Sequence, residues 1–266
     1  MKIVRTVAGV RHVLAPLRAS STIALVPTMG ALHAGHMALC DAARHAAGVV
    51  VASIFINPTQ FGDPADFSSY PRDEAKDAAV AATAGVDVIF APSVEELYPR
   101  GYATWIDVQG PALGLEGEFR PGHFRGVATV CAKLFTAVAP HLAFFGQKDA
   151  QQAAVVKQLI SDLNLDVEIR VVPTVRDADG LALSSRNARL SSEERRRALA
   201  IPKALDAGLS AYRERKDPVS AARAVLSGQA GVDVDYVAVA DFDGRPTLAI
   251  AARVGRTRLI DNVVLT

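Results

Sequence analysis

This sequence has few cysteines, a small net charge and no long apolar segment. Its 266 residues include two cysteines, Cys40 and Cys131, which lie far apart in apolar segments and are expected to be buried thiols. The formal net charge of +1 argues against general binding to nucleic acid or to an anionic membrane. No apolar run is suited to crossing a bilayer, and the first residues do not form a signal peptide. We therefore expect a soluble cytoplasmic protein without a nucleic-acid or membrane partner.

Several familiar site motifs are also missing. The sequence has neither G-x-x-x-x-G-K-[ST] nor G-x-G-x-x-G, so a bound nucleotide would have to be held by another device. Two aspartate-rich segments begin at Asp177 and Asp241, but their twelfth positions are Ala188 and Ala252 where a calcium loop needs glutamate. Both segments are expected to be turns.

Short apolar runs alternate with amphipathic stretches through the first two thirds of the chain. Runs without polar alternation indicate strands covered on both faces, as in a parallel sheet. The predicted strands are 22–26, 49–56, 86–91, 142–145 and 167–172, and the predicted helices are 35–47, 73–84, 124–139 and 150–163. This alternation predicts a doubly wound, Rossmann-like α/β domain over residues 1–175, with ligands at the carboxyl ends of its strands.

The remaining residues, 176–266, predict a smaller α+β domain. Ser191 and Glu194 form a capping-box pattern at the start of a charged helix, and a second helix is expected over 218–226. Residues 232–241 alternate between apolar and polar, as a half-exposed strand does, and two further apolar segments follow. We expect this domain to act as a lid.

The segment PTMGALHAGH places two histidines, His33 and His36, at the first junction between a strand and a helix. Free N–H groups and the helix dipole favour an anion there, and two imidazoles add donors to phosphate oxygens. An ordinary turn with two surface histidines is the alternative. The pair favours phosphate contact and does not favour a metal site, because no further ligand cluster completes a shell.

Polar residues follow the later strands as well. Asn57 and Gln60 are neutral groups suited to a hydroxyl or carboxylate, but the alternative is an ordinary Asn-Pro turn and the segment alone does not decide. Lys148 and Asp149 are suited to a phosphate and to water-bound Mg²⁺, or to ordinary surface charge.

Two segments near helices supply cations. Glu116 and Arg120 stand in EGEFRPGHFRGV, which is either an anion-binding segment or a solvated loop. Ser184, Ser185 and Arg186 offer two hydroxyls and a cation, a combination suited to a triphosphate.

Six segments in the same order resemble the pantoate–β-alanine ligase family of AMP-forming enzymes, within the H-x-G-H nucleotidylyltransferase superfamily. They are PTMGALHAGH, FINPTQF, YPRD, EGEFRPGHFRGV, FGQKDAQQ and VPTVRDADGLALSSRN, and they cover nearly the whole chain. The resemblance implies that ATP activates pantoate as pantoyl adenylate, and that β-alanine then displaces AMP to give pantothenate. It also implies a homodimer.

The resemblance further implies a role for individual residues. The ATP-binding set would be Met29, Gly30, Ala31, Leu32, His33, Ala34, Gly35, His36, Gly146, Gln147, Lys148, Asp149, Val175, Leu183, Ser184, Ser185 and Arg186. Within it the catalytic residues would be His33, His36, Lys148 and Arg186, with His36 at the proton-donor position, and Asp149 would lie near Mg²⁺. Gln60, Gln152 and Asn57 would bind pantoate, and Gln60 would later contact β-alanine.

Two positions depart from the family pattern, since Gln147 stands where glutamate is usual and Leu183 where methionine is usual. Two other functions remain open. One is an H-x-G-H adenylyltransferase that acts on a phosphate acceptor, which the neutral Asn57, Gln60 and Gln152 disfavour. The other is a nucleotide-binding module without catalysis.

Overall fold

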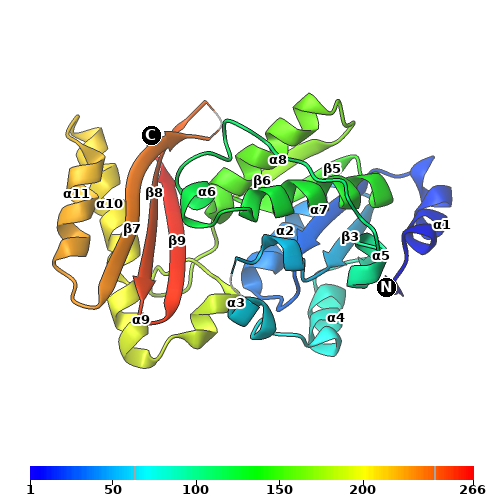
Figure 1. Cartoon of the computed structure of the whole chain (residues 1–266), viewed down its shortest axis with the longest axis horizontal. Coiled ribbons are helices and arrows are strands. Elements are labelled where there is room, and N and C mark those ends of the chain that lie inside the picture. Colours follow the sequence, from blue (N-terminus) through cyan, green and yellow to red (C-terminus); the bar gives the residue numbers. More distant parts are fainter. Residues whose placement is uncertain (63, 243) are drawn as a thin grey trace. The chain divides into compact units, whose positions relative to one another are not determined.

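The apolar runs form the strands of a six-stranded parallel sheet (Figure 1). The computed structural model describes residues 1–62, 64–242 and 244–266. The strands are β1 (Lys2–Val4), β2 (Ile23–Thr28), β3 (Val49–Ile54), β4 (Val88–Phe90), β5 (Leu142–Gly146) and β6 (Glu168–Val172). Five of them were predicted, with ends that differ by at most two residues. The first strand was not predicted, because three residues are too few to show a pattern.

Each strand buries residues on both faces of the sheet. Ile23 and Leu25 of β2 belong to one apolar cluster, and the alternate residues Ala24 and Val26 belong to another. Because successive side chains of a strand point to opposite faces, a strand buried on both sides reads as an unbroken apolar run. This confirms the predicted doubly wound α/β class.

Helices cover both faces of the sheet. One cluster contains side chains of α1 (Val7–Arg18), α7 (His123–Val138) and α8 (Ala150–Asp162), and the other contains side chains of α2 (Ala34–Ala46) and α4 (Glu74–Thr83). The shorter helical segments are η1 (Pro58–Gln60), α3 (Pro64–Ser68), α5 (Val94–Leu97), α6 (Glu116–Phe119) and η2 (Gln147–Asp149). The four helices predicted for this region are confirmed to within one residue at each end.

The sheet reverses its winding between β2 and β5. The strand order is β1-β4-β3-β2-β5-β6, so the chain adds β3 and β4 on one side of β2 and later adds β5 and β6 on the other. Ligands of open α/β sheets bind at the carboxyl ends of the strands beside such a reversal. The PTMGALHAGH segment leaves β2 at this point, and the FGQKD segment leaves β5.

The C-terminal part of the chain forms a three-stranded antiparallel sheet with helices on one side (Figure 1). Its elements are η3 (Ser185–Arg189), α9 (Ser192–Ala198), α10 (Ala200–Arg213), α11 (Pro218–Ser227), β7 (Val232–Asp241), β8 (Pro246–Val254) and β9 (Thr257–Val264). The Ser191–Glu194 capping box is present. The charged segment after it forms two helices instead of one, because Pro202 in the first turn of α10 has no N–H to continue the hydrogen bonding of α9.

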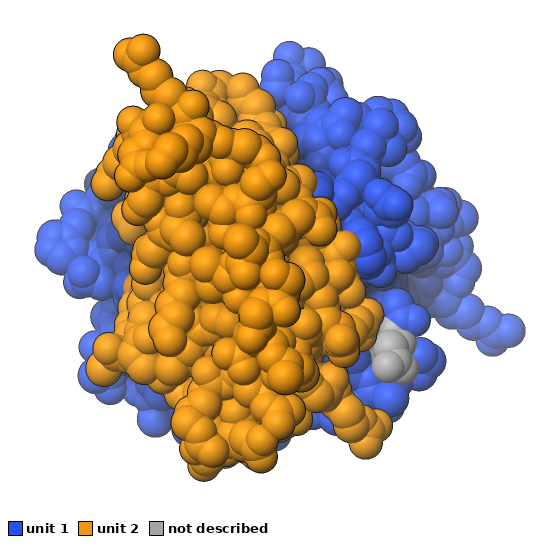
Figure 2. Space-filling model, turned by 90° about the vertical axis from the view of Figure 1, so that its left-hand side faces the viewer, with its two compact units in different colours: residues 1–146, 151–172 blue, residues 147–150, 173–266 orange. Residues whose placement is uncertain are grey.

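The chain folds as two compact units, which Figure 2 colours separately. Unit 1 comprises residues 1–146 and 151–172, and unit 2 comprises residues 147–150 and 173–266. The domains predicted as 1–175 and 176–266 stay a prediction, since compactness does not establish independent folding. The turn predicted from Asp241 includes residue 243, which lies outside the described residues.

Two expectations from composition concern the cysteines and membrane spans. Both Cys40 and Cys131 are buried free thiols, as predicted. Among the residues that the structure describes, no helix has the length and apolar character needed to cross a membrane.

Candidate functional site

The loop after β2 contains two consecutive residues in the left-handed backbone region. Gly30 has a φ of 80° and Ala31 a φ of 51°. The hydroxyl of Thr28 stabilises the turn by donating to the Ser53 carbonyl at 2.6 Å and accepting from the Gly30 N–H at 3.2 Å. A Cβ atom on residue 30 would lie 2.7 Å from the Asp77 carboxylate, so both φ and space require glycine there.

The carboxylate of Asp77 holds the next two residues of the loop. Its two oxygens accept the Ala31 N–H at 2.9 Å and the Leu32 N–H at 2.7 Å. Asp77 belongs to α4 and is 3% exposed. A buried carboxylate is tolerated here because each of its oxygens accepts a backbone hydrogen bond.

The two histidines cap the helix that follows the loop. Nδ1 of His33 accepts the Gly35 N–H at 3.1 Å, and Nδ1 of His36 accepts the His33 N–H at 3.2 Å. The ring centroids are 4.1 Å apart. A nitrogen that accepts a backbone N–H carries no proton, so in neutral rings the proton is on Nε2. The caps therefore set both imidazoles as Nε2–H donors.

The N–H groups of this loop are used by the protein itself. Those of residues 30–33 and 35 donate to Thr28, Asp77, His36 and His33. These N–H groups are therefore not free, because side chains of the chain satisfy the donors, and contact of this segment with phosphate stays a prediction. The groups of this segment that are suited to an anion are the imidazole Nε2–H donors.

Gln60 is held beside the loop by a neighbouring amide. Its Nε2 donates to the sulfur of Met29 at 3.1 Å, and its Oε1 accepts from Asn57 Nδ2 at 3.1 Å. Asn57 is 1% exposed and also donates to the Gly126 carbonyl at 3.1 Å. Asn57 therefore sets the orientation of the Gln60 amide.

The charged segment before α7 holds the backbone of Gln60. His123 Nδ1 lies 2.9 Å from the Gln60 carbonyl oxygen, and Arg120 donates to the same oxygen at 3.4 Å. Arg120 also lies 3.5 Å from the carboxylate of Glu116, which is 5% exposed. These residues are thus gathered at Gln60, and the alternative of a solvated loop is wrong for this segment.

A buried glutamine next to a predicted substrate ligand holds the preceding loop. The Gln151 side chain accepts from the Glu116 N–H at 3.0 Å and donates to the carbonyls of Pro111, Leu113 and Gly114 at 3.0 to 3.3 Å. Gln152 lies beside it in the first turn of α8 and is partly buried.

In unit 2, the turn that carries Lys148 and Asp149 is fastened to β9. Asn262 Nδ2 donates to the carbonyls of Gln147 and Lys148, both at 2.9 Å, and Gln147 Nε2 donates to Asn262 Oδ1 at 3.1 Å. Lys148 Nζ lies 3.8 Å from the Asp149 carboxylate, whose side chain is 45% exposed. The amide of Gln147, one of the two departures from the family pattern, is part of this arrangement.

An ion pair with a buried carboxylate supports the same turn through the residue before Asn262. Arg176 donates to the Asp261 carboxylate at 2.6 and 3.1 Å, and Asp261 accepts the Asn262 N–H at 2.8 Å. Burial raises the pKa of Asp261, while the hydrogen bonds from Arg176 act in the opposite direction.

The predicted Ser184–Arg186 clamp starts a short helix in unit 2. Ser184 Oγ caps η3 by accepting the Arg186 N–H at 3.2 Å, and the Leu183 N–H donates to the Val175 carbonyl at 3.0 Å. Two buried oxygens, Thr174 Oγ1 and Asn187 Oδ1, flank these segments in sequence and have no partner among the described residues. A ligand or water is the physical expectation for such atoms.

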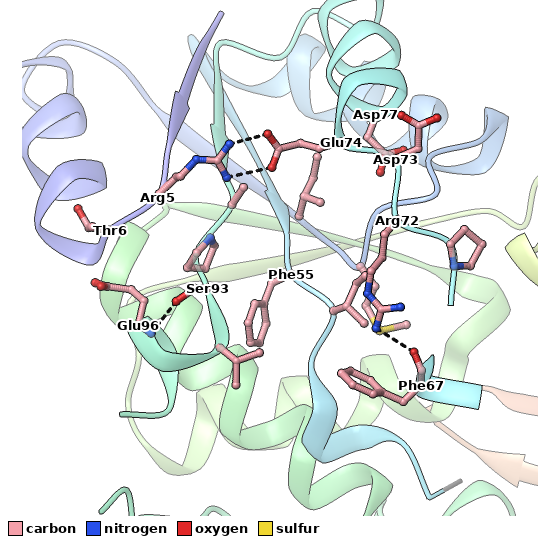
Figure 3. Close-up of a pocket in the computed structure, with 17 residues that line it drawn as sticks. Arg5, Thr6, Phe55, Phe67, Arg72, Asp73, Glu74, Asp77, Ser93 and Glu96 are labelled. Carbon is pink, nitrogen blue, oxygen red and sulfur yellow. Dashed lines mark hydrogen bonds and ion pairs between the residues drawn. The ribbon is translucent and has the colours of Figure 1, made fainter. Parts of the chain in front are cut away.

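A cavity of about 550 Å³ opens in unit 1 beyond the ends of β1, β3 and β4 (Figure 3). Met29 and Asp77 line it, whereas Gln60 and the two histidines do not. Arg5 and Glu74 pair across it at 2.6 and 2.9 Å, and Arg72 donates to the Phe67 carbonyl at 2.9 Å. The phosphate and pantoate ligands predicted from the sequence are not among the residues that line this cavity.

Among the described residues, no three His, Cys, Asp or Glu side chains lie close enough together to hold a metal ion. The structure therefore gives no support for a metal site made of protein groups alone. A Mg²⁺ ion held through substrate phosphates needs only one or two carboxylates. Asp149 is the carboxylate that the sequence predicts for this role.

The sequence analysis missed several residues that hold the segments described above. They are Thr28, Asp77, Gln151, Arg176 and Asn262. Thr28, Gln151 and Arg176 lie within the six segments that resemble the family but were given no role there, and Asp77 and Asn262 lie outside them. A polar side chain on the buried face of an element, such as Asp77 on α4, was the available signal.

Comparison with known proteins now connects this geometry with a family. The sequence profile described as pantoate-beta-alanine ligase matches residues 2–264. A pantothenate synthetase from Moorella thermoacetica is 50% identical over 279 aligned positions, which cover 100% of this chain and 99% of that protein.

Solved structures agree with this match. The pantothenate synthetase of Thermus thermophilus has a TM-score of 0.91 and 43% identity, covering 100% of this chain and 99% of its own. The pantoate-beta-alanine ligase of Francisella tularensis, crystallised with "Beta-gamma ATP" and β-alanine, has a TM-score of 0.85 and 34% identity, covering 99% and 97%. The chain therefore belongs to the pantoate–β-alanine ligase family.

Proposed function

We propose that this chain condenses pantoate with β-alanine through a pantoyl-adenylate intermediate. A carboxylate oxygen of pantoate attacks the α-phosphorus of ATP, and the bond to pyrophosphate breaks. The amine of β-alanine then attacks the acyl carbon, AMP leaves with the bonding electrons, and the nitrogen loses a proton to give the amide of pantothenate. Activation is necessary because the carboxylate alone would have to expel oxide.

The observation that carries the proposal is the pair of histidines that cap α2, directly after the loop that follows β2. Each Nδ1 accepts a backbone N–H, which supports Nε2–H donors directed at phosphate oxygens. We assign His36 as the proton donor and His33 as its partner on the phosphates. The remaining ATP contacts in unit 1 are assigned to residues 29–36 and Gly146.

Residues of unit 2 are also assigned to ATP. Lys148 and Arg186 are assigned to the negative charge of the phosphates, and Gln147, Val175 and residues 183–185 to the rest of the nucleotide. The unpartnered Thr174 and Asn187 oxygens beside these residues in sequence support a ligand there. Catalysis comes from alignment and charge stabilisation, without a side-chain nucleophile.

We assign the pantoate hydroxy acid to neutral amides. Gln60 contacts pantoate and later β-alanine, and Gln152 contacts pantoate. The hydrogen bonds of Asn57 to Gln60 and Gly126 support a role in orienting Gln60. Direct contact between Asn57 and pantoate stays a prediction.

Mg²⁺ fits this site as a companion of ATP. Asp149 would hold it through water, and the ion would neutralise phosphate charge. The ATP and β-alanine of the Francisella relative support the same ligands here. A homodimer and a cytoplasmic location remain predictions from the resemblance and the composition.

Pyrophosphate exchange into ATP tests the proposal. With Mg²⁺ and pantoate present and β-alanine left out, labelled pyrophosphate should enter ATP, and omission of pantoate should abolish the exchange. Exchange without pantoate would contradict the adenylate step. Binding of ATP without exchange, followed by transfer to a phosphate acceptor, would favour the adenylyltransferase alternative. Binding without any turnover would favour a nucleotide-binding module.

A further inference from the structure

We propose that Asp77 is a positioning residue for the ATP-binding loop. Its carboxylate occupies the two N–H groups of the left-handed turn and thereby places the imidazoles of His33 and His36. The functional part of this inference rests on the proposed assignment of that loop to ATP. The structural part, that one buried carboxylate holds the loop, stands on hydrogen bonds within unit 1.

The turn makes a small anion-binding concavity that the protein fills with its own anion. Gly30 and Ala31 both have positive φ values. In a turn of this kind consecutive backbone N–H groups point toward the same place. The Ala31 and Leu32 N–H groups bind separate oxygens of Asp77 at 2.9 and 2.7 Å. A side chain with two acceptor oxygens and no donor fits this pair, and an amide does not.

Asp77 is itself fixed by the first turn of α4. Asp73 caps this helix by accepting the Lys76 N–H at 3.0 Å, and its carbonyl accepts the Asp77 N–H at 2.9 Å. Glu74, the first residue of α4, forms an ion pair with two hydrogen bonds to Arg5, which follows β1 (Figure 3). The carboxylate therefore reaches the loop from a helix whose first residue also pairs with the residue after the edge strand β1.

The loop passes this constraint to the histidines. His33 directly follows the two residues held by Asp77, and its N–H donates to His36 Nδ1. A turn released at Ala31 and Leu32 would lose the conformation that starts α2 at its capping histidine. Because the histidines are assigned to ATP phosphates, the loss should affect ATP more than pantoate.

The replacement Asp77→Asn tests this with little change in size. The asparagine amide leaves one of the two N–H groups facing another donor. An unsatisfied buried N–H lowers the equilibrium constant for the native loop conformation by about tenfold or more. We expect the KM for ATP to rise about tenfold while the KM for pantoate changes less than about twofold. Amide hydrogen exchange at Ala31 and Leu32 should accelerate in parallel.

The replacement Asp73→Asn is the matched control. It removes the same charge from the same helix, but asparagine keeps the cap and the residue is exposed. It should leave the KM for ATP and the exchange at Ala31 and Leu32 unchanged. Equal effects of the two replacements would show a general charge effect and overturn the proposal.

Failure of this inference differs from failure of the proposed function. If the unaltered protein shows no pantoate-dependent pyrophosphate exchange, the proposed function fails, whereas protection of the Ala31 and Leu32 amides still tests the structural part. If exchange occurs and Asp77→Asn keeps a normal KM for ATP, the inference fails alone. If that variant does not fold, hydrogen exchange of the Ala31 and Leu32 amides in the unaltered protein decides. Fast exchange overturns the inference, and slow exchange supports it.

Discussion

A histidine that caps a helix differs from a serine or aspartate cap because it has a second nitrogen on the other side of its ring. In His33 and His36 one nitrogen accepts from the backbone, so the opposite nitrogen becomes the donor. The same side chains thus fix the start of α2 and set the tautomer that the proposed contact with phosphate requires.

The two nitrogens of His36 are separable by substitution. In His36→Asn, Oδ1 replaces Nδ1 and keeps the cap, whereas the Nε2–H donor is lost. We expect turnover to fall by about 100-fold or more while the melting temperature stays within about 2 °C. Turnover and thermal unfolding of the purified variant check this.

His36→Ala provides the comparison. It removes the cap as well as the donor, so we expect the same loss of turnover together with a destabilisation of about 1 kcal/mol. Near-normal turnover in His36→Asn would remove Nε2 of His36 from the mechanism.

At the scale of elements, the distance between α7 and η1 decides where Gln60 lies. Gly126 permits their contact, because a Cβ atom there would lie 2.5 Å from the Thr59 carbonyl oxygen and 2.8 Å from the Gln60 nitrogen. The backbone of η1 would have to move to admit even a methyl group.

Gly126→Ala should therefore displace Gln60. We expect a loss of stability of about 1 to 3 kcal/mol and a higher KM for pantoate, measured by denaturant unfolding and steady-state kinetics. Gly62→Ala is the control, since a Cβ atom at Gly62 meets nothing within 4 Å. Unchanged KM and stability in Gly126→Ala would show that η1 adapts without cost.

The turn at η2 depends on β9 in a similar way. Asn262→Ala leaves the carbonyls of Gln147 and Lys148 and the Gln147 amide without their partner at a site where residue 262 is 5% exposed. We expect a destabilisation of about 1 to 3 kcal/mol and a higher KM for ATP, because Lys148 loses its fixed backbone. Thermal unfolding and kinetics check this.

Gln229→Ala is a suitable comparison in the same unit, since the Gln229 side chain makes a single exposed hydrogen bond of 3.5 Å. It should change neither the melting temperature nor the KM. If Asn262→Ala behaves like it, β9 does not hold the turn.

At the scale of the whole molecule, the reactivity of both thiols measures the unfolding of unit 1. Cys40 and Cys131 lie in the two apolar clusters of unit 1. Burial raises the pKa of Cys40 to about 11 and that of Cys131 to about 12. At pH 8 the thiolate form of Cys131 is therefore about one part in ten thousand.

Alkylation of the native protein should consequently stay slow between pH 7 and 9 and become fast when unit 1 unfolds. Above pH 9 the unfolded chain loses thiol protons that the folded chain keeps, so stability should fall as the pH rises. Mass spectrometry after timed alkylation, with and without denaturant, measures both effects. Rapid labelling of the native protein would contradict the buried assignment.

The assembly is a separate prediction at this scale. A homodimer would have a mass of about 56 kDa, twice the 28.1 kDa of the chain. Sedimentation equilibrium distinguishes the two states. A mass of 28.1 kDa at micromolar concentration would rule out the dimer.

The sequence by itself determined the class of fold and the segments that carry chemistry. Strands buried on both faces read as unbroken apolar runs, and helix periodicity and caps located the helices to within one residue in unit 1. The H-x-G-H spacing and five other ordered segments identified the family. These features are local in the chain, so they survive without knowledge of the packing.

Only the tertiary structure decided which groups in those segments remain available to a ligand. The sequence analysis expected the N–H groups before α2 to take a phosphate, but Asp77, 45 residues away from Leu32, takes two of them. Asn262 holds the Lys148 carbonyl from 114 residues away. Every residue except proline carries the same backbone donor and acceptor, so the sequence does not show which partner each one has. The partner is the buried side chain that the fold brings within about 3 Å.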